Sequence, residues 1–144
     1  MKMKYLTSAA MLLLLAGGTI AEAQSLKIRQ KQADQEKQLE ENIPPLNKAC
    51  GTEIVVKFDW KDVPGEELEK YSASSYCDAA MSGIRHICED DIGKKAVKEK
   101  IKTMTCGFGA ERSVSLKDGV LDYKINFSST NDMEYVYKFL QDNL

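Results

Sequence analysis

The sequence has little of the chemistry on which most enzymes and metal proteins depend. It contains a single histidine, His86, and none of its four cysteines forms a C-x-x-C pair. It also lacks a phosphate loop, a dinucleotide-binding fingerprint and a nucleophile motif. The acidic cluster at residues 89–91 lacks the spaced oxygen ligands of a calcium loop. We therefore expect no metal and no cofactor, and these absences favour a protein that is not an enzyme.

His86 itself is placed unfavourably for catalysis. It lies nine positions from Cys77 in a segment with a helical pattern, which puts it roughly 180° away from the cysteine around the helix. We therefore expect an ordinary surface histidine that faces water.

A long hydrophobic run is also missing. The apolar stretch from Ala9 to Ile20 is shorter than the ~20 residues that a lasting membrane span needs. Lysines precede this stretch, and the small-residue pattern Ala21-Glu22-Ala23 follows it, which is the order of a secretory signal peptide. We predict a signal peptide over residues 1–23 and a soluble mature chain from Gln24, exported to the periplasm or the extracellular space. The lysine-rich start favours a bacterial origin.

Neither sign of charge is in excess, because the formal net charge is −2. Five lysines do gather between residues 94 and 102, but no aromatic residues lie between them to stack on bases. We interpret the run as a solvated helix face and expect no nucleic acid as a partner.

The four cysteines are Cys50, Cys77, Cys88 and Cys106. In an exported chain an even number favours disulfides. Cys77 and Cys88 lie on one helix, and eleven residues of helix rise ~16.5 Å, whereas a disulfide needs Cα atoms within about 7 Å. These two therefore cannot bond to each other, and two pairings remain. We favour Cys50–Cys88 with Cys77–Cys106, because the helix is expected to run back along the strand that follows Cys50.

The apolar pattern predicts an α+β domain with a small four-stranded, mainly antiparallel sheet and helices on one face. A polar helical lead-in over residues 24–43 should end at Pro44-Pro45, and a single disulfide-bonded domain should follow over residues 44–144. The expected strands cover residues 53–60, 103–109, 112–117 and 120–127, and the expected long helices cover 74–89 and 131–144. Asp91 is expected to cap a short helix between them, and Asp118-Gly119 predicts a hairpin.

Two aromatic residues are the possible partner surface. Tyr135 and Phe139 lie four positions apart, on the side of the last helix away from its predicted inner stripe, which consists of Met133, Val136, Tyr137 and Leu140. Three interpretations stay open: the N-terminal helix covers them, a partner covers them, or they are isolated exposed aromatics.

These observations lead to three hypotheses about function. The first is a non-enzymatic binding module, such as an inhibitor or immunity-like protein, that acts on a protein or envelope partner. The second is a small secreted hydrolase with acidic residues near Trp60, and the third is a structural envelope protein. A deep cleft with two close carboxylates beside Trp60 would favour the hydrolase, whereas a flat sheet face or an aromatic patch would favour the binding module.

Overall fold

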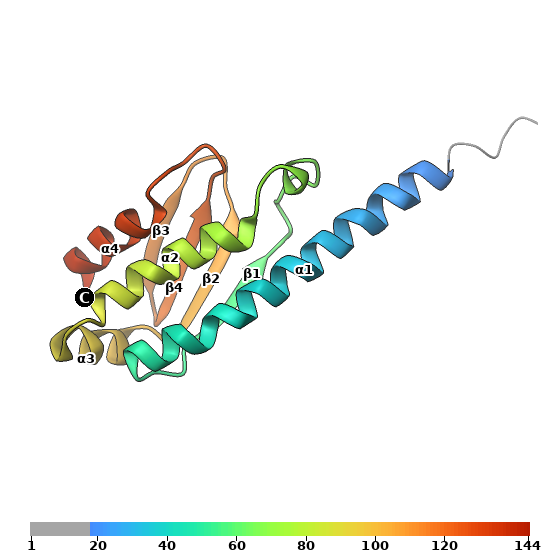
Figure 1. Cartoon of the computed structure of the whole chain (residues 1–144). Coiled ribbons are helices and arrows are strands. Elements are labelled where there is room, and N and C mark those ends of the chain that lie inside the picture. Colours follow the sequence, from blue (N-terminus) through green and yellow to red (C-terminus); the bar gives the residue numbers. More distant parts are fainter. Residues whose placement is uncertain (1–17) are drawn as a thin grey trace, which may run out of the picture.

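The structure, a computed structural model, describes residues 18–144; residues 1–17, which hold most of the predicted signal peptide, lie outside the described residues. The elements are α1 (Gly18–Cys50), β1 (Val55–Asp59), η1 (Glu67–Glu69), α2 (Ala73–Ile87), α3 (Asp91–Lys100), β2 (Thr103–Phe108), β3 (Ser113–Lys117), β4 (Val120–Ile125) and α4 (Asp132–Asn143). The predicted α+β class is confirmed (Figure 1). Within the described residues, no helix is long and apolar enough to cross a bilayer.

The sheet is mixed. Its strand order is β1-β2-β4-β3, in which β1, β2 and β4 are parallel and β3, at the edge, is antiparallel to β4. The prediction of a mainly antiparallel sheet is therefore wrong. It rested on the alternation of apolar and polar residues, but a parallel sheet that is covered on only one face alternates in the same way.

Two connections generate this order. The chain leaves β1, returns along α2 and α3, and enters β2 parallel to β1. After β2 it crosses to the edge, forms β3, and turns back into β4, which lies between β3 and β2. Asp118 and Gly119 at this turn have φ angles of 51° and 80°, as a type I′ hairpin turn requires, so the predicted hairpin is confirmed.

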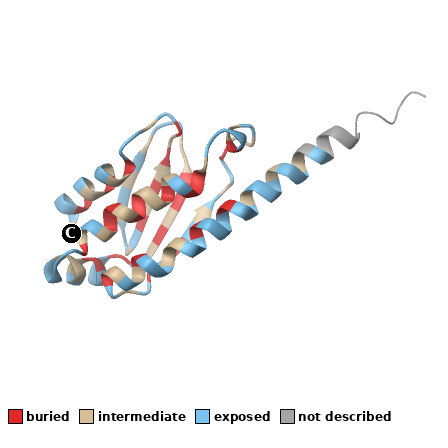
Figure 2. Cartoon of the chain, in the orientation of Figure 1, coloured by how far each residue is buried: buried red, intermediate tan, exposed pale blue. Residues whose placement is uncertain are grey.

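The helices α1, α2 and α4 lie on one face of the sheet (Figure 1). Buried residues, coloured red in Figure 2, occur along these helices and along the strands, and together they form the hydrophobic core. The strand residues that point into this core are Val56, Met104, Cys106, Leu121, Tyr123 and Ile125, and Ile54, just before β1, is buried with them. The core thus forms a single layer between the helices and one side of the sheet.

Helix α1 continues through Pro44 and Pro45, so the predicted end of the helix at this pair is wrong. A proline inside a helix removes a hydrogen bond and crowds the carbonyl four residues earlier. Here buried residues fix the helix on both sides of the pair: Leu39 is 4% exposed and Leu46 is fully buried. The prolines and the residues four positions before them are exposed, so water can solvate the released carbonyls. The helix ends at Cys50, and Gly51 follows it in the left-handed conformation, with a φ of 63°.

Two disulfides hold the helices to each other and to the sheet. Cys50–Cys88 joins the C-terminal ends of α1 and α2, with Cα atoms 5.1 Å apart. Cys77–Cys106 joins α2 to the central strand β2, with Cα atoms 6.0 Å apart. The favoured pairing is confirmed, because α2 runs back along β1 and brings its far end to Cys50, as the geometry of the helix predicted.

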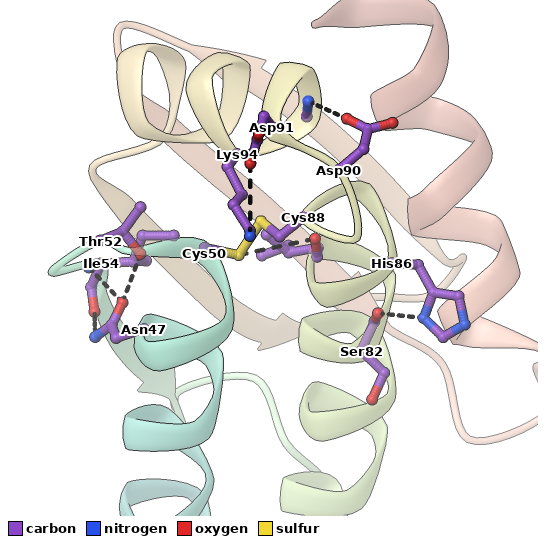
Figure 3. Close-up of a disulfide and its surroundings, with 12 residues drawn as sticks. Asn47, Cys50, Thr52, Ile54, Ser82, His86, Cys88, Asp90, Asp91 and Lys94 are labelled. Atoms are coloured by element: carbon purple, nitrogen blue, oxygen red, sulfur yellow. Dashed lines mark hydrogen bonds and ion pairs between the residues drawn. A yellow bond between two sulfur atoms is a disulfide. The ribbon is translucent and has the colours of Figure 1, made fainter.

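The turn after the first disulfide is held by one amide side chain (Figure 3). Asn47 accepts hydrogen bonds from the Ile54 amide at 2.8 Å and the Thr52 hydroxyl at 2.9 Å, and it donates to the Ile54 carbonyl at 3.1 Å. These contacts direct the chain from the end of α1 into β1.

Helix α4 packs closely on α2 at Gly83. A Cβ atom at Gly83 would lie 2.7 Å from the Met133 carbonyl oxygen and 3.0 Å from the Tyr137 nitrogen. Of the predicted inner stripe of α4, Val136 and Leu140 are fully buried. The absence of a side chain at position 83 therefore sets how closely the two helices approach.

Candidate functional site

The face of the sheet away from the helices carries three rows of side chains in register. They alternate along each strand with the residues that point into the core, so they point to the opposite side. The rows are Val55–Thr103–Val120–Lys117, Lys57–Thr105–Asp122–Ser115 and Asp59–Gly107–Lys124–Ser113. We call these residues the open sheet face.

The polar side chains at the centre of the open sheet face are linked to one another by a hydrogen bond and an ion pair. The Thr105 hydroxyl donates to the Asp122 carboxylate at 2.5 Å, and the Lys124 ammonium lies 3.6 Å from the same carboxylate. Lys124 lies beside Gly107, where a Cβ atom would come within 2.9 Å of its ammonium nitrogen. The glycine therefore lets a long cationic side chain lie against the sheet.

Apolar groups complete this surface. Val55 and Val120, on either side of Thr103 in the same row, are 50% and 36% exposed. Apolar side chains beside hydrogen-bonding and charged ones form the mixed composition found in non-obligate protein interfaces.

The predicted partner pair lies elsewhere, on α4. Tyr135 and Phe139 are half-buried and pack against the core, and the Arg112 guanidinium lies over the Tyr135 ring at 4.0 Å from its centroid. Helix α1 lies on the other side of α2 from α4 (Figure 1). As a partner surface, this pair stays a prediction.

The carboxylates near Trp60 make structural contacts. The Trp60 indole nitrogen donates to Glu36 of α1 at 2.6 Å, and its ring lies 4.2 Å from that of Phe58. Asp59 accepts the Lys61 backbone amide at 3.0 Å. Trp60 thus fixes α1 to the end of β1, and it lines none of the four main cavities of the described residues.

His86 is exposed, as predicted, with Nδ1 3.0 Å from the Ser82 carbonyl oxygen (Figure 3). The cap of α3 is Asp90, whose side chain accepts the Gly93 amide at 2.7 Å, so the prediction of Asp91 as the cap is wrong by one residue. Among the described residues, no cluster of three or more histidine, cysteine or acidic residues could hold a metal ion.

Three of the five lysines of the basic run make local contacts. Lys94 and Lys95 lie 3.9 and 4.0 Å from Asp91 and Glu99, and Lys102 donates to the Lys98 carbonyl at 2.5 Å. Lys100 instead donates to the Asn143 carbonyl at the end of α4, at 3.3 Å. This is the arrangement of a solvated helix face.

A buried polar network was missed by sequence reasoning. The Tyr123 hydroxyl donates to Asp132, which is 6% exposed, and the Ser129 hydroxyl donates to the same oxygen at 3.1 Å. The Arg112 guanidinium lies 3.6 Å away. Burial and the hydrogen bond to Asp132 raise the pKa of Tyr123. Only the helix-start pattern at Asn131-Asp132 marked this position, and it gave no sign of burial.

Comparison of the chain with protein-family models, with curated proteins and with solved structures finds no significant match.

Proposed function

We propose that this protein is a non-enzymatic exported binding module and that its open sheet face contacts a protein partner. One observation carries this proposal. Three neighbouring strands of the sheet are parallel, and no element of the described residues covers the open sheet face. All-parallel sheets occur almost only with both faces covered, and three of the four strands here, β1, β2 and β4, are parallel to one another. A partner that packs on the open sheet face would supply the missing layer.

The rigidity of the domain supports this role. The Cys77–Cys106 disulfide lies directly behind the centre of the open sheet face, on the central strand β2. A surface that is already ordered loses little conformational entropy when it binds, which raises affinity. The two disulfides and the predicted signal peptide both suit an oxidising compartment, so we place the protein in the periplasm or outside the cell.

A flat four-stranded face of this length is about 20 Å by 17 Å. That is less than the ~800 Å² per partner that a standard interface buries. The partner should therefore also contact the loops at the strand ends, or bind with modest affinity. Either outcome suits an inhibitor or immunity-like protein that recognises one target.

Site-directed photocrosslinking in the producing organism tests the proposal. A photoreactive amino acid is placed at Lys57 or Ser115 on the open sheet face, and at Lys95 or Glu134 on the exposed helices as matched controls. We expect one discrete protein adduct from both sheet positions and none from the controls. Adducts that form equally at all four positions, or none at the sheet positions, would reject the proposed surface.

A further inference from the structure

Two adjoining hollows lie along α1, on the helical side of the molecule. The first lies between α1 and residues 68–72, which precede α2, and the second lies between α1 and the N-terminal part of α2. Their volumes are about 320 Å³ and 300 Å³, and Gln38 lines both. We call them together the α1–α2 groove. Along α1 the groove extends from Lys31 to Asn42, which corresponds to ~16 Å of helix.

The side-chain amide of Gln35, a mostly buried residue of the groove, has an unpaired hydrogen-bond donor. Gln35 is only 6% exposed, and its Oε1 accepts the Ser74 backbone amide at 3.3 Å, which fixes the orientation of the side chain. Its Nε2 has no hydrogen-bond partner among the described residues. No fully buried side-chain nitrogen or oxygen there lacks a partner, so Nε2 keeps some exposure to solvent, and Gln35 lines the first hollow.

The N-terminus of α2 adds a cluster of hydroxyl groups beside this amide. The Ser74 hydroxyl donates to Gln38 Oε1 at 3.0 Å, and the Ser75 hydroxyl donates to Ser72 Oγ at 3.0 Å. The Gln38 amide nitrogen, like that of Gln35, is left without a partner among the residues described. The groove therefore offers several donors and acceptors in fixed positions.

The lining of the first hollow selects against ions. Two lysines, Lys31 and Lys70, are offset by two carboxylates, Asp34 and Glu69. Glu69 is also paired with Lys27 at 2.6 Å, and this hydrogen bond lowers the pKa of Glu69. Opposite charges in equal number give the first hollow no net attraction for an anion or a cation. The second hollow is lined by two carboxylates, Glu41 and Asp78, which disfavour anions, and Asp78 is paired with Arg85 at 3.4 Å.

The lining also selects against apolar ligands and peptide side chains. The only aliphatic residue that lines the first hollow is Leu68, which is 2% exposed and belongs to the core, and the second hollow has none. Polypeptides gain most of their binding energy from a few aromatic or aliphatic anchors in pockets. The groove provides no such pocket.

One aromatic ring borders the groove. Tyr71 is 39% exposed, and one side of its ring stacks on Phe127 with centroids 5.0 Å apart and planes 8° from parallel. The negative face of an aromatic ring attracts weakly positive C–H groups. Such a ring beside hydrogen-bonding amides fits a ligand that has both C–H faces and hydroxyl groups.

We propose that the α1–α2 groove binds a neutral oligosaccharide strand. Each sugar hydroxyl can accept and donate a hydrogen bond at the same time. It can therefore accept one from Gln35 Nε2 and donate one to the carboxylate of Asp34, Glu41 or Asp78. The groove lies on the helical side and the open sheet face on the other, so a glycan and a protein partner can bind together. This inference does not depend on the function proposed for the sheet.

Titration of the exported protein with defined probes tests the inference. The probes are the tetrasaccharides of β-1,4-linked N-acetylglucosamine, α-1,4-linked glucose and β-1,4-linked glucose, with a neutral Gly-Ser octapeptide as the competing class. Binding is measured by calorimetry and by amide NMR shifts. We expect at least one tetrasaccharide to bind and to shift the amides of Ser72, Ser74 and Ser75, with no shift at β3.

Matched amide-to-acid variants then test the contact. Gln35→Glu and Gln38→Glu keep the acceptor oxygen that holds α2 and remove the free donor, while Gln141→Glu on α4 makes the same change far from the groove. We expect affinity to fall about tenfold in the first two and to stay unchanged in the third. Gln38 is exposed, so its variant reports even where Gln35→Glu fails to fold.

Three outcomes would overturn the inference: no tetrasaccharide binds at millimolar concentration, the octapeptide alone binds in the groove, or a tetrasaccharide binds with the same affinity to the wild type and to Gln38→Glu. Photocrosslinking at the open sheet face can succeed or fail independently of each of these results.

Discussion

The Cys77–Cys106 disulfide should contribute a large part of the stability of this domain. The bridge closes a loop with a sequence separation of 29 residues. In the chain-entropy model, a loop of that length restricts the unfolded chain by about 3.6 kcal/mol at 25 °C. Domains of this kind are stable by only about 5–15 kcal/mol. The double variant Cys77→Ala/Cys106→Ala should therefore remain folded but lose about a quarter to nearly three-quarters of its free energy of unfolding.

The second bridge provides the matched control. Cys50–Cys88 has a sequence separation of 38 residues, for which the same model gives about 3.9 kcal/mol. The two double variants should thus lose nearly equal amounts. Both bridges are buried, with no cysteine more than 3% exposed, so differences in solvent access should not separate them.

Urea denaturation of the unreduced proteins, followed by circular dichroism, measures both losses. A loss below about 1 kcal/mol in either variant would refute the reasoning, because it would mean that the corresponding bridge does not restrict the unfolded chain. Equal losses of 3 kcal/mol or more, together with non-reduced peptide maps that recover the two pairs, would support it.

Three further predictions concern single positions. Pro45→Ala should stabilise the protein by about 1 kcal/mol in urea denaturation, because it restores a helical hydrogen bond at an exposed site inside α1; destabilisation would mean that the helix ends there. Gly83→Ala should lower the free energy of unfolding by about 1–2 kcal/mol, because the new Cβ would meet the Met133 carbonyl at 2.7 Å, despite the better helix propensity of alanine; an unchanged midpoint would contradict the close helix crossing. The pKa of Tyr123 is raised in the folded protein by burial and by Asp132. The contribution of Tyr123 to the free energy of unfolding is therefore complete below pH ~10, its pKa in the unfolded chain, and is lost as the pH rises above that value. Tyr123→Phe should therefore lower the free energy of unfolding by about 1–2 kcal/mol at pH 7. Above pH 10 the variant should lose stability less steeply with pH than the wild type. An equally steep loss in both proteins would show that ionisation of Tyr123 does not cause it.

Much of the fold could be predicted from local patterns. The hairpin at Asp118-Gly119 follows from the φ angles that only such residues adopt easily, and the disulfide pairing follows from the rise of a helix between Cys77 and Cys88. Strand direction could not be predicted in this way. The alternation of apolar and polar residues along a strand shows that only one face of the sheet is covered, and it does not show the direction of the neighbouring strands. The strands β1, β2 and β4 alternate because helices cover one face of the sheet, although these strands are parallel.

The end of the first helix was mispredicted for a different reason. Local propensity places a stop at Pro44-Pro45, but the packing of Leu39 and Leu46 on the domain outweighs it. The buried residues of α1 include Gln35, a polar residue, so the apolar stripe looked too sparse to be a packed helix face.

The candidate sites could be predicted only in part. The outward residues of each strand, such as Lys57 and Asp122, follow from the period of two, but their rows across the sheet depend on a strand order that the sequence does not show. The groove depends on α1 and α2 lying side by side, and the burial of Asp132 depends on the start of α4 meeting Tyr123 of β4. These are long-range arrangements, and no local pattern encodes them.

Lysine footprinting tests the central claim, a binding surface on the open sheet face, most directly. The purified protein and the same protein in a native extract of the producing cells and their medium are acetylated briefly, and the labelling of each lysine is measured by mass spectrometry. Lys57 and Lys117 lie on the open sheet face, whereas Lys95 and Lys98 are exposed on α3. We predict that all four react in the purified protein and that only Lys57 and Lys117 become protected in the native extract. Equal labelling of all four lysines in both samples would contradict the account.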